Sequence, residues 1–249
     1  MTDPRRVWRW PRRGDDGPIT VLAHRGGTGP WRENTLEAFA GALRLGADGV
    51  ELDVRRTSDG RLVVLHDAEI AGTGAVHDLR AKELPPWVPG LDEALETCAG
   101  AAVNVEIKNA PVEPGFDPTV TVATEVVAAL AASTAAPGRA PAHLNVSSFW
   151  PASLAAVRAA GPEVSTGLLV HPSLDSSRAA EQAAALGCVA LHPFHSHATP
   201  ALVDRVHGLA MSVVVWTVND ELDLAAVAAA GADVVISDRV ADTLAALGR

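Results

Sequence analysis

HRGGTGPWRENTLEAFAGALRLGADGVELDVRRTSDGRLVVLHD, residues 24–67, is the stretch that decides the fold, because it joins two short apolar runs through one helix-like segment. The first run ends at His24, and the second contains Glu51 and Asp53 between aliphatic residues. Since successive side chains of a strand point to opposite faces, the two carboxylates share one face and the aliphatic residues take the other. Two carboxylates on one face of a buried strand repel each other, so one takes up a proton unless a cation neutralises them. The simplest cation is a hard divalent metal, which prefers oxygen ligands.

The same alternation of apolar runs and helical segments continues along the chain. Strands are predicted at 19–24, 49–54, 102–108, 143–148, 164–169, 188–192, 212–218 and 233–237. Helices are predicted at 34–45, 91–98, 118–132, 152–160, 176–186, 200–208, 221–229 and 240–247. Strict alternation predicts an α/β protein with a parallel sheet, and the number of strands predicts closure into a (β/α)8 TIM barrel. An open, doubly wound sheet is the alternative.

Residues 61–90 are predicted to form a small insertion after the second strand. Within it, 62–65 resembles an extra strand that pairs back across the turn at Asp59-Gly60. Residues 18–249 are predicted to form a single domain, in which 137–141 is a surface loop.

Several predicted helices begin with residues that favour a first turn. Pro151 and Pro200 suit a first helical position, and Asp220 offers a capping oxygen. Asn34, followed three residues later by Glu37, resembles a capping box, so Asn34 is the predicted N-cap of the first helix.

The composition indicates a globular protein. With 249 residues, 48% hydrophobic and 20% charged, the chain can bury a large core. Its formal net charge of −10 argues against nucleic acid as a partner, but one local cation is enough for a small anionic substrate. Cys98 and Cys188 are too few for a disulfide framework. Without a signal peptide or an apolar run of about 18 residues, a soluble cytoplasmic protein is expected. Residues 1–17 are expected to be a poorly ordered tail, with a docking segment as the alternative.

Polar residues follow the predicted strands at the end where parallel barrels carry their active sites. They are His24, Arg25, Glu51, Asp53, Glu106, Lys108, Ser147, Ser148, His192, Trp216, Asn219, Ser237 and Asp238. Glu106 and Lys108 repeat the two-residue spacing, so three carboxylates and a lysine are expected to converge at one mouth. Three carboxylates suit Mg²⁺ or Ca²⁺, and the sequence does not choose between them. Because Lys82 is the only other lysine, beside 18 arginines, a specific role is favoured for Lys108.

These residues also have structural interpretations. Glu106 and Lys108 could form a buried ion pair, and Trp216 could simply pack at the rim. A lone histidine is more often structural than catalytic. Two histidines, His24 and His66, near a metal and a phosphate-binding cation are nevertheless what acid–base chemistry at neutral pH requires.

A second histidine group has the spacing H-x2-H-x-H: His192, His195 and His197. It could hold a separate transition metal. The preferred interpretation places His192 in the pocket and the other two on a loop.

Motifs distributed along the chain resemble those of one known family in their order and spacing. They are HRG at 24–26, ENT at 33–35, GADGVELDV at 46–54, TSDGRLVVLHD at 57–67, VEIK at 105–108, SSF at 147–149 and WTVN at 216–219. Together they resemble the glycerophosphodiester phosphodiesterase family, within the phospholipase C-like phosphodiesterase superfamily. The resemblance implies metal-dependent hydrolysis of a glycerophosphodiester to sn-glycerol 3-phosphate and an alcohol, on a TIM barrel.

The resemblance also implies roles for individual residues. Three carboxylates would hold one divalent cation: Glu51, Asp53 and Glu106. Four side chains would bind the substrate: Arg25 and Lys108 at the phosphate, Trp216 and Asn219 at the alcohol. Two histidines would transfer protons, one as base and one as acid: His24 and His66. The nucleophile would be the glycerol 2-hydroxyl, which gives a cyclic phosphate that water then opens; direct attack by water is the alternative.

The chain departs from the family pattern at the rim. Arg32 stands where a proline usually precedes Glu-Asn-Thr, and Trp150 stands where an acidic residue usually follows Ser-Ser-Phe. The segment after Asp67 lacks the usual Asp-Arg-Thr-Thr-like stretch. The metal and histidine positions are intact, so these differences bear on the choice of substrate.

Three other functions remain open. A lysophospholipase D-like enzyme on the same barrel is disfavoured by the lack of an apolar membrane-binding stretch. A barrel amidohydrolase would use the histidines at 192–197 and would contain zinc. A non-catalytic barrel that binds phosphodiesters would not need two proton-transfer groups.

Overall fold

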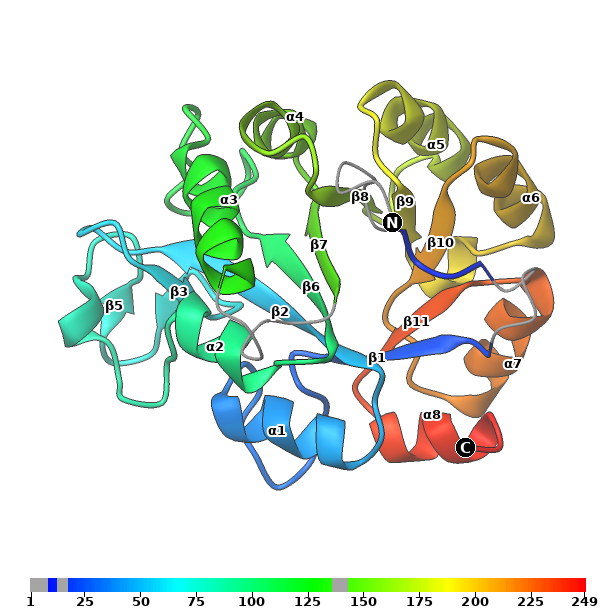
Figure 1. Cartoon of the computed structure of the whole chain (residues 1–249), viewed down its shortest axis with the longest axis horizontal. Helices are drawn as coiled ribbons and strands as arrows, with labels where there is room; N and C mark the ends of the chain where they lie inside the picture. Colours follow the sequence, from blue (N-terminus) through cyan, green and yellow to red (C-terminus); the bar gives the residue numbers. More distant parts are fainter. Residues whose placement is uncertain (1–8, 13–17, 136–142) are drawn as a thin grey trace.

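The structure is a computed structural model that describes residues 9–12, 18–135 and 143–249. In these residues, eight parallel strands form a closed barrel (Figure 1). They are β1 (Thr20–His24), β2 (Gly49–Arg56), β6 (Ala102–Ile107), β7 (His143–Ser148), β8 (Ser165–Val170), β9 (Ala190–Pro193), β10 (Ser212–Val215) and β11 (Val234–Ser237). The ring closes because β1 pairs with β11 on one side and with β2 on the other. The predicted TIM barrel is therefore confirmed, and the open sheet is excluded.

Helices form an outer ring around the strands (Figure 1). In the described residues they are α1 (Leu36–Arg44), α2 (Leu91–Thr97), α3 (Thr121–Thr134), α4 (Pro151–Ala160), α5 (Ser176–Ala185), α6 (Pro200–Gly208), α7 (Glu221–Ala230) and α8 (Val240–Ala246). The predicted helices and strands match these elements within a few residues. One difference is at 212–218, where β10 already ends at Val215 and the following residues turn into a loop at the mouth. The predicted surface loop at 137–141 lies outside the described residues.

Two apolar layers hold the barrel together. Side chains that point outward from the strands, such as Leu52 and Val105, pack with helix residues such as Phe39 and Leu154. A smaller cluster fills the barrel interior and includes Leu22 and neighbouring aliphatic residues of β9, β10 and β11. Burial of these side chains removes apolar surface from water, which is the dominant favourable contribution to folding. No helix in the described parts of the chain is long and apolar enough to cross a membrane.

The insertion after β2 is present as predicted and brings His66 to the mouth. Its strand β3 (Leu62–Val64) runs antiparallel to the far end of β2. The turn between them uses Gly60, whose φ of +80° is costly for other residues. A two-stranded sheet of β4 (Glu69–Ile70) and β5 (Gly74–Ala75) follows, and then the short 3-10 helix η2 (Ala81–Glu83).

The N-terminal segment contributes one buried residue to the barrel. Trp10 is 2% exposed and packs inside the ring against residues such as Ala102 and Val234, at the amino ends of their strands. The Ser212 hydroxyl donates a hydrogen bond to the Trp10 carbonyl. The prediction of a poorly ordered tail thus needs correction at residues 9–12, which dock on the barrel at the end opposite the predicted site. The other residues before position 18 lie outside the described ranges.

Candidate active site

Three buried carboxylates lie together at the carboxyl ends of β2 and β6. Glu51, Asp53 and Glu106 are 3%, 1% and 9% exposed, and one oxygen of each lies within 4.8 Å of the others. Asp53 and Glu106 are direct partners in the pairing of the two strands, which explains their proximity. The predicted convergence of the three acids is what the structure shows.

The carboxylates crowd one another strongly enough to disfavour full ionisation. Burial, followed by the charge of Asp53, raises the pKa of Glu51 to about 8. Burial also raises the pKa of Glu106, although Lys108 opposes this. Burial would raise the pKa of Asp53 as well, but Lys108 and Arg25 outweigh it and lower that pKa.

The site has the features of a divalent metal centre. The Oε1 atom of Glu51 is buried without a hydrogen-bond partner among the described residues. A cavity of about 20 Å³ lies beside it, lined by Glu51, Glu106, His24 and Trp216 among others. That is enough for a particle of the size of a water molecule. Clustered carboxylate oxygens with an unpartnered atom fit a hard cation such as Mg²⁺ or Ca²⁺.

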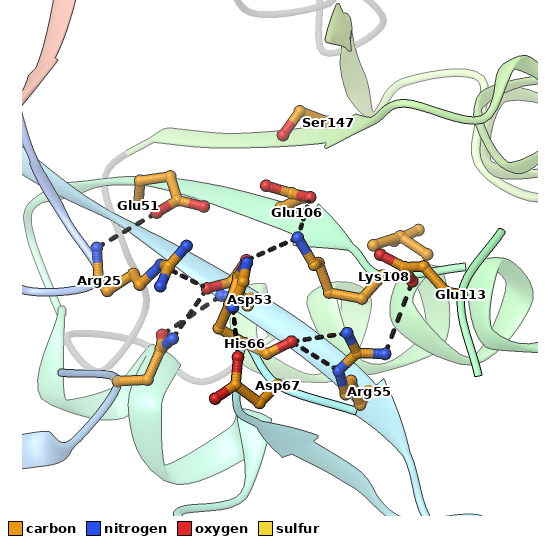
Figure 2. Close-up of polar contacts among 12 residues, drawn as sticks. Arg25, Glu51, Asp53, Arg55, His66, Asp67, Glu106, Lys108, Glu113 and Ser147 are labelled. Atoms are coloured by element: carbon orange, nitrogen blue, oxygen red, sulfur yellow. Dashed lines mark hydrogen bonds and ion pairs between the residues drawn. The ribbon is translucent and has the colours of Figure 1, made fainter. Parts of the chain in front are cut away.

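Two cations border the carboxylates (Figure 2). Arg25 Nε lies 3.2 Å from Asp53 Oδ2, and the Arg25 backbone N–H donates to Glu51 Oε2. Lys108 Nζ lies 2.8 Å from Glu106 Oε1 and 3.6 Å from Asp53 Oδ1. The buried-ion-pair interpretation of Glu106 and Lys108 is therefore correct as geometry, but the pair belongs to a larger charged cluster.

Asn34 is a site residue that sequence reasoning misassigned. Thr35 caps α1 instead, because its hydroxyl accepts from the Ala38 N–H. Asn34 has a φ of 55°, and its amide donates to Asp53 Oδ2 at 2.8 Å while accepting from the Asp53 N–H. The capping-box spacing to Glu37 pointed to Asn34, whereas Thr35 has Ala38 at that spacing and still caps the helix with its hydroxyl. Asn34 holds Asp53 in place.

His24 is held by a carboxylate from the far end of the chain. Its Nδ1 lies 2.7 Å from Asp238 Oδ1, and its Nε2 lies 4.0 Å from Glu51 Oε2. Burial would lower the pKa of His24, but the hydrogen bond with Asp238 and the charge of Glu51 outweigh it and raise the pKa. Asn219 holds Asp238 with both ends of its amide, at 2.6 and 2.9 Å. The sequence predicts Asp238 only as a polar residue at a strand end and Asn219 at the alcohol; in the structure both lie in a supporting position behind His24.

His66 lies near Asp53, and the two side chains interact electrostatically (Figure 2). Its Nδ1 is 2.8 Å from Oδ1 of the exposed neighbour Asp67. Burial lowers the pKa of His66, and the charge of Asp53 opposes this shift. Each histidine thus has its Nδ1 beside a carboxylate, so that Nε2 is the ring nitrogen available for proton exchange.

Aromatic rings line the opposite part of the mouth. Trp216 makes edge-on contacts with Phe149 and Phe194, with centroids 5.5 and 5.2 Å apart. Its indole N–H donates to the His192 carbonyl. Trp150 packs edge-on against Phe116, with ring centroids 6.0 Å apart. Trp216 therefore packs at the rim and also lines the cavity beside Glu51.

The histidines of the 192–197 segment do not converge. The ring of His195 pairs with Asp223, and that of His197 meets the Ser176 hydroxyl. The buried ring of His192 has no hydrogen-bond partner among the described residues. Burial lowers the pKa of His192 to about 3, so its ring is neutral. Its side chain is fully buried next to Gly167, so the prediction that it lines the pocket is wrong. A transition-metal site of the amidohydrolase kind has no support here.

A closed barrel with a charged site at the carboxyl ends of its strands is an enzyme architecture. Comparison with known proteins identifies the class: the model of the glycerophosphoryl diester phosphodiesterase family matches residues 24–242. The chain belongs to this family and is a phosphodiesterase of the hydrolase class.

Individual relatives agree with this assignment. A glycerophosphodiester phosphodiesterase of Caldanaerobacter subterraneus subsp. tengcongensis is 31% identical over 239 residues, which is 88% of this chain and 93% of that protein. The structure of an Oleispira antarctica phosphodiesterase in complex with the product sn-glycerol-3-phosphate superposes with a TM-score of 0.78 at 26% identity, covering 93% of this chain and 98% of that one. A human lysophospholipase D is 40% identical over only 79 residues, 30% of this chain and 25% of that protein.

Proposed function

We propose that the protein hydrolyses glycerophosphodiesters to sn-glycerol 3-phosphate and an alcohol, with one divalent cation, Mg²⁺ or Ca²⁺, at Glu51, Asp53 and Glu106. The observation that carries this proposal is the buried carboxylate triad with a lysine and an arginine at its edge, His24 beside Glu51 and His66 near Asp53. When bound, the cation would polarise a phosphoryl oxygen and balance the carboxylate charge.

Arg25 and Lys108 would bind the phosphate. Both side chains are largely buried and already stand against carboxylates, so their charge is poorly screened by water. Negative charge that builds on the phosphoryl oxygens in the transition state would be stabilised by these preorganised donors. Trp216 and the rings around it would contact the alcohol that leaves.

His24 and His66 would move the protons. One takes the proton of the nucleophile, the glycerol 2-hydroxyl, as a new P–O bond forms. The other donates a proton to the alcohol oxygen as the old P–O bond breaks. Water then opens the cyclic phosphate with the two roles exchanged. Asp238 and Asp67 would set the tautomer of each ring, so that Nε2 carries the exchange.

The test is release of sn-glycerol 3-phosphate from glycerophosphocholine and glycerophosphoethanolamine, with Mg²⁺ or Ca²⁺ and with a chelator. We expect release that needs the metal and that His24→Ala and His66→Ala each reduce about a hundredfold or more. The control is His143→Ala, an exposed histidine at the amino end of β7. Absence of release from either substrate by folded, metal-loaded protein would contradict the proposal.

Two further substrates refine the test. Lysophosphatidylcholine distinguishes the lysophospholipase D alternative, to which the partial likeness with the human enzyme points. A substrate without the 2-hydroxyl distinguishes the nucleophile: full activity on it, with no cyclic phosphate detected on the normal substrate, would indicate direct attack by water.

A further inference from the structure

Arg55 lies two residues beyond Asp53 on β2 and points to the same face of the strand, toward the mouth. Its side chain is 9% exposed. The guanidinium donates two hydrogen bonds to the main-chain carbonyl of His66, from Nε at 2.8 Å and from Nη2 at 2.6 Å (Figure 2). Charge-assisted bonds from two atoms of a planar group fix the acceptor in distance and in direction.

The remaining nitrogen of Arg55 faces another loop. Nη1 lies 3.6 Å from Glu113 Oε2, in the segment between β6 and α3 that follows Lys108 (Figure 2). Arg55 therefore ties the insertion that carries His66 to the loop that follows the phosphate-binding lysine.

The ring of His66 needs such an anchor. Its hydrogen-bond partner is the adjacent Asp67, whose side chain is 75% exposed and moves with the same loop. The preceding Leu65 N–H donates to the Asp53 carbonyl, which fixes the chain just before the histidine. Beyond that point, Arg55 holds the carbonyl of His66 itself.

We propose that Arg55 is a positioning residue that holds the His66 main chain so that the imidazole meets the substrate at proton-transfer distance. The inference rests on the proposed role of His66 in proton transfer. A displacement of about 1 Å at a reacting group can cost on the order of a hundredfold in rate. Residues that orient a functional side chain typically contribute about 10- to 100-fold.

Arg56 provides a matched control. It is the next residue, it points to the opposite face of β2, and it is also ion-paired, with Glu125 of α3 at 2.7 Å. Its contacts hold a helix and not the mouth. Arg56→Met removes one ion-paired arginine from the same strand without touching His66, although Arg56 is 39% exposed and Arg55 only 9%.

The experiment measures kcat and KM for Arg55→Met, Arg55→Lys and Arg56→Met, and it repeats Arg55→Met in the His66→Ala background. We expect Arg55→Met to lower kcat about 10- to 100-fold with KM changed less than about threefold. Arg55→Lys keeps the charge but loses the two-atom contact, so its kcat should lie between those of Arg55→Met and the unmodified protein. Arg56→Met should stay within about twofold of the unmodified protein.

The double variant is decisive. If Arg55 acts through His66, its removal should cost less than about threefold once the imidazole is gone, because residues that act as a unit are not additive. The inference would be overturned if Arg55→Met lowered kcat in the His66→Ala background by as large a factor as in the unmodified protein. Equal effects of Arg55→Met and Arg56→Met on kcat would also overturn it. Thermal unfolding of each variant shows whether a loss of kcat comes from a destabilised fold or from a displaced His66. If Arg55→Met does not fold, the kcat of Arg55→Lys tests the proposal instead. If His66→Ala alone has no effect, the proposed function fails instead.

Discussion

The buried carboxyl group of Glu51 makes the stability of the metal-free protein depend on pH. Its pKa rises from the ordinary 4.5 to about 8 in the fold, by burial and by the charge of Asp53. Between these pH values the folded protein binds more protons than the unfolded chain, so raising the pH destabilises the fold. The favourable contribution is complete below pH 4.5 and is lost as the pH rises through about 8. At about 1.4 kcal/mol per pH unit, the loss is at most about 5 kcal/mol.

Other titratable groups at the site also make the free energy of unfolding depend on pH. The lowered pKa of Asp53 contributes stability that is lost only in more acidic solution, below the ordinary value of 3.8. The raised pKa of His24 also contributes stability that is lost as the pH rises, as for Glu51. Glu51→Gln isolates the contribution of Glu51, because glutamine keeps the shape of the neutral acid and cannot ionise.

The assay is urea unfolding in the presence of a chelator, followed by circular dichroism from pH 5 to 8. We expect the free energy of unfolding of the unmodified protein to fall by several kcal/mol relative to Glu51→Gln over this range. A saturating divalent cation should reverse the trend, since it binds the ionised carboxylate, and should add about 2.7 kcal/mol at a hundredfold excess over Kd. Identical pH dependence in the two proteins would show that Glu51 is ionised in the metal-free fold, which would refute the argument that these carboxylates require a cation.

Three further substitutions test the surroundings of the site. Asp238→Asn removes the charge behind His24 and should lower kcat about 10- to 100-fold without unfolding the protein; a change below about threefold would show that Asp238 does not orient the imidazole. Asn34→Ala should weaken divalent-cation binding by about 10- to 100-fold, measured by calorimetry, because Asp53 loses its amide partner; unchanged affinity would contradict that role. Trp10→Ala should lower the free energy of unfolding by about 3–5 kcal/mol in urea while kcat stays unchanged; a loss of kcat would mean that the docked segment influences the mouth.

Local patterns predicted the barrel and the carboxylates well, for a physical reason. Strand periodicity alone places Glu51 and Asp53 on one face, and it repeats for Glu106 and Lys108. The alternation of elements then brings these strand ends to one mouth. Each of these steps uses only residues that are close in the sequence.

The supporting contacts could not be predicted in the same way, because they join distant parts of the chain. Asp238 reaches His24 across 214 positions. Asn34 carried a helix-cap pattern that its neighbour Thr35 satisfies instead. Trp10 lies in a basic segment whose composition resembles that of a disordered tail. Its burial depends on the apolar interior at the amino-terminal end of the barrel, which exists only once all the strands have closed into a ring.

The division of the mouth into two parts has an evolutionary consequence. The charged side chains that would break the P–O bond come from strands and loops up to Lys108, whereas Phe149, Phe194 and Trp216 belong to later loops. Loops tolerate substitution far better than the strands they connect. If these rings contact the alcohol as proposed, mutations in their loops would change which alcohol is accepted while the charged side chains of the first half stay in place, as long as Asp238 and Asn219 continue to hold His24.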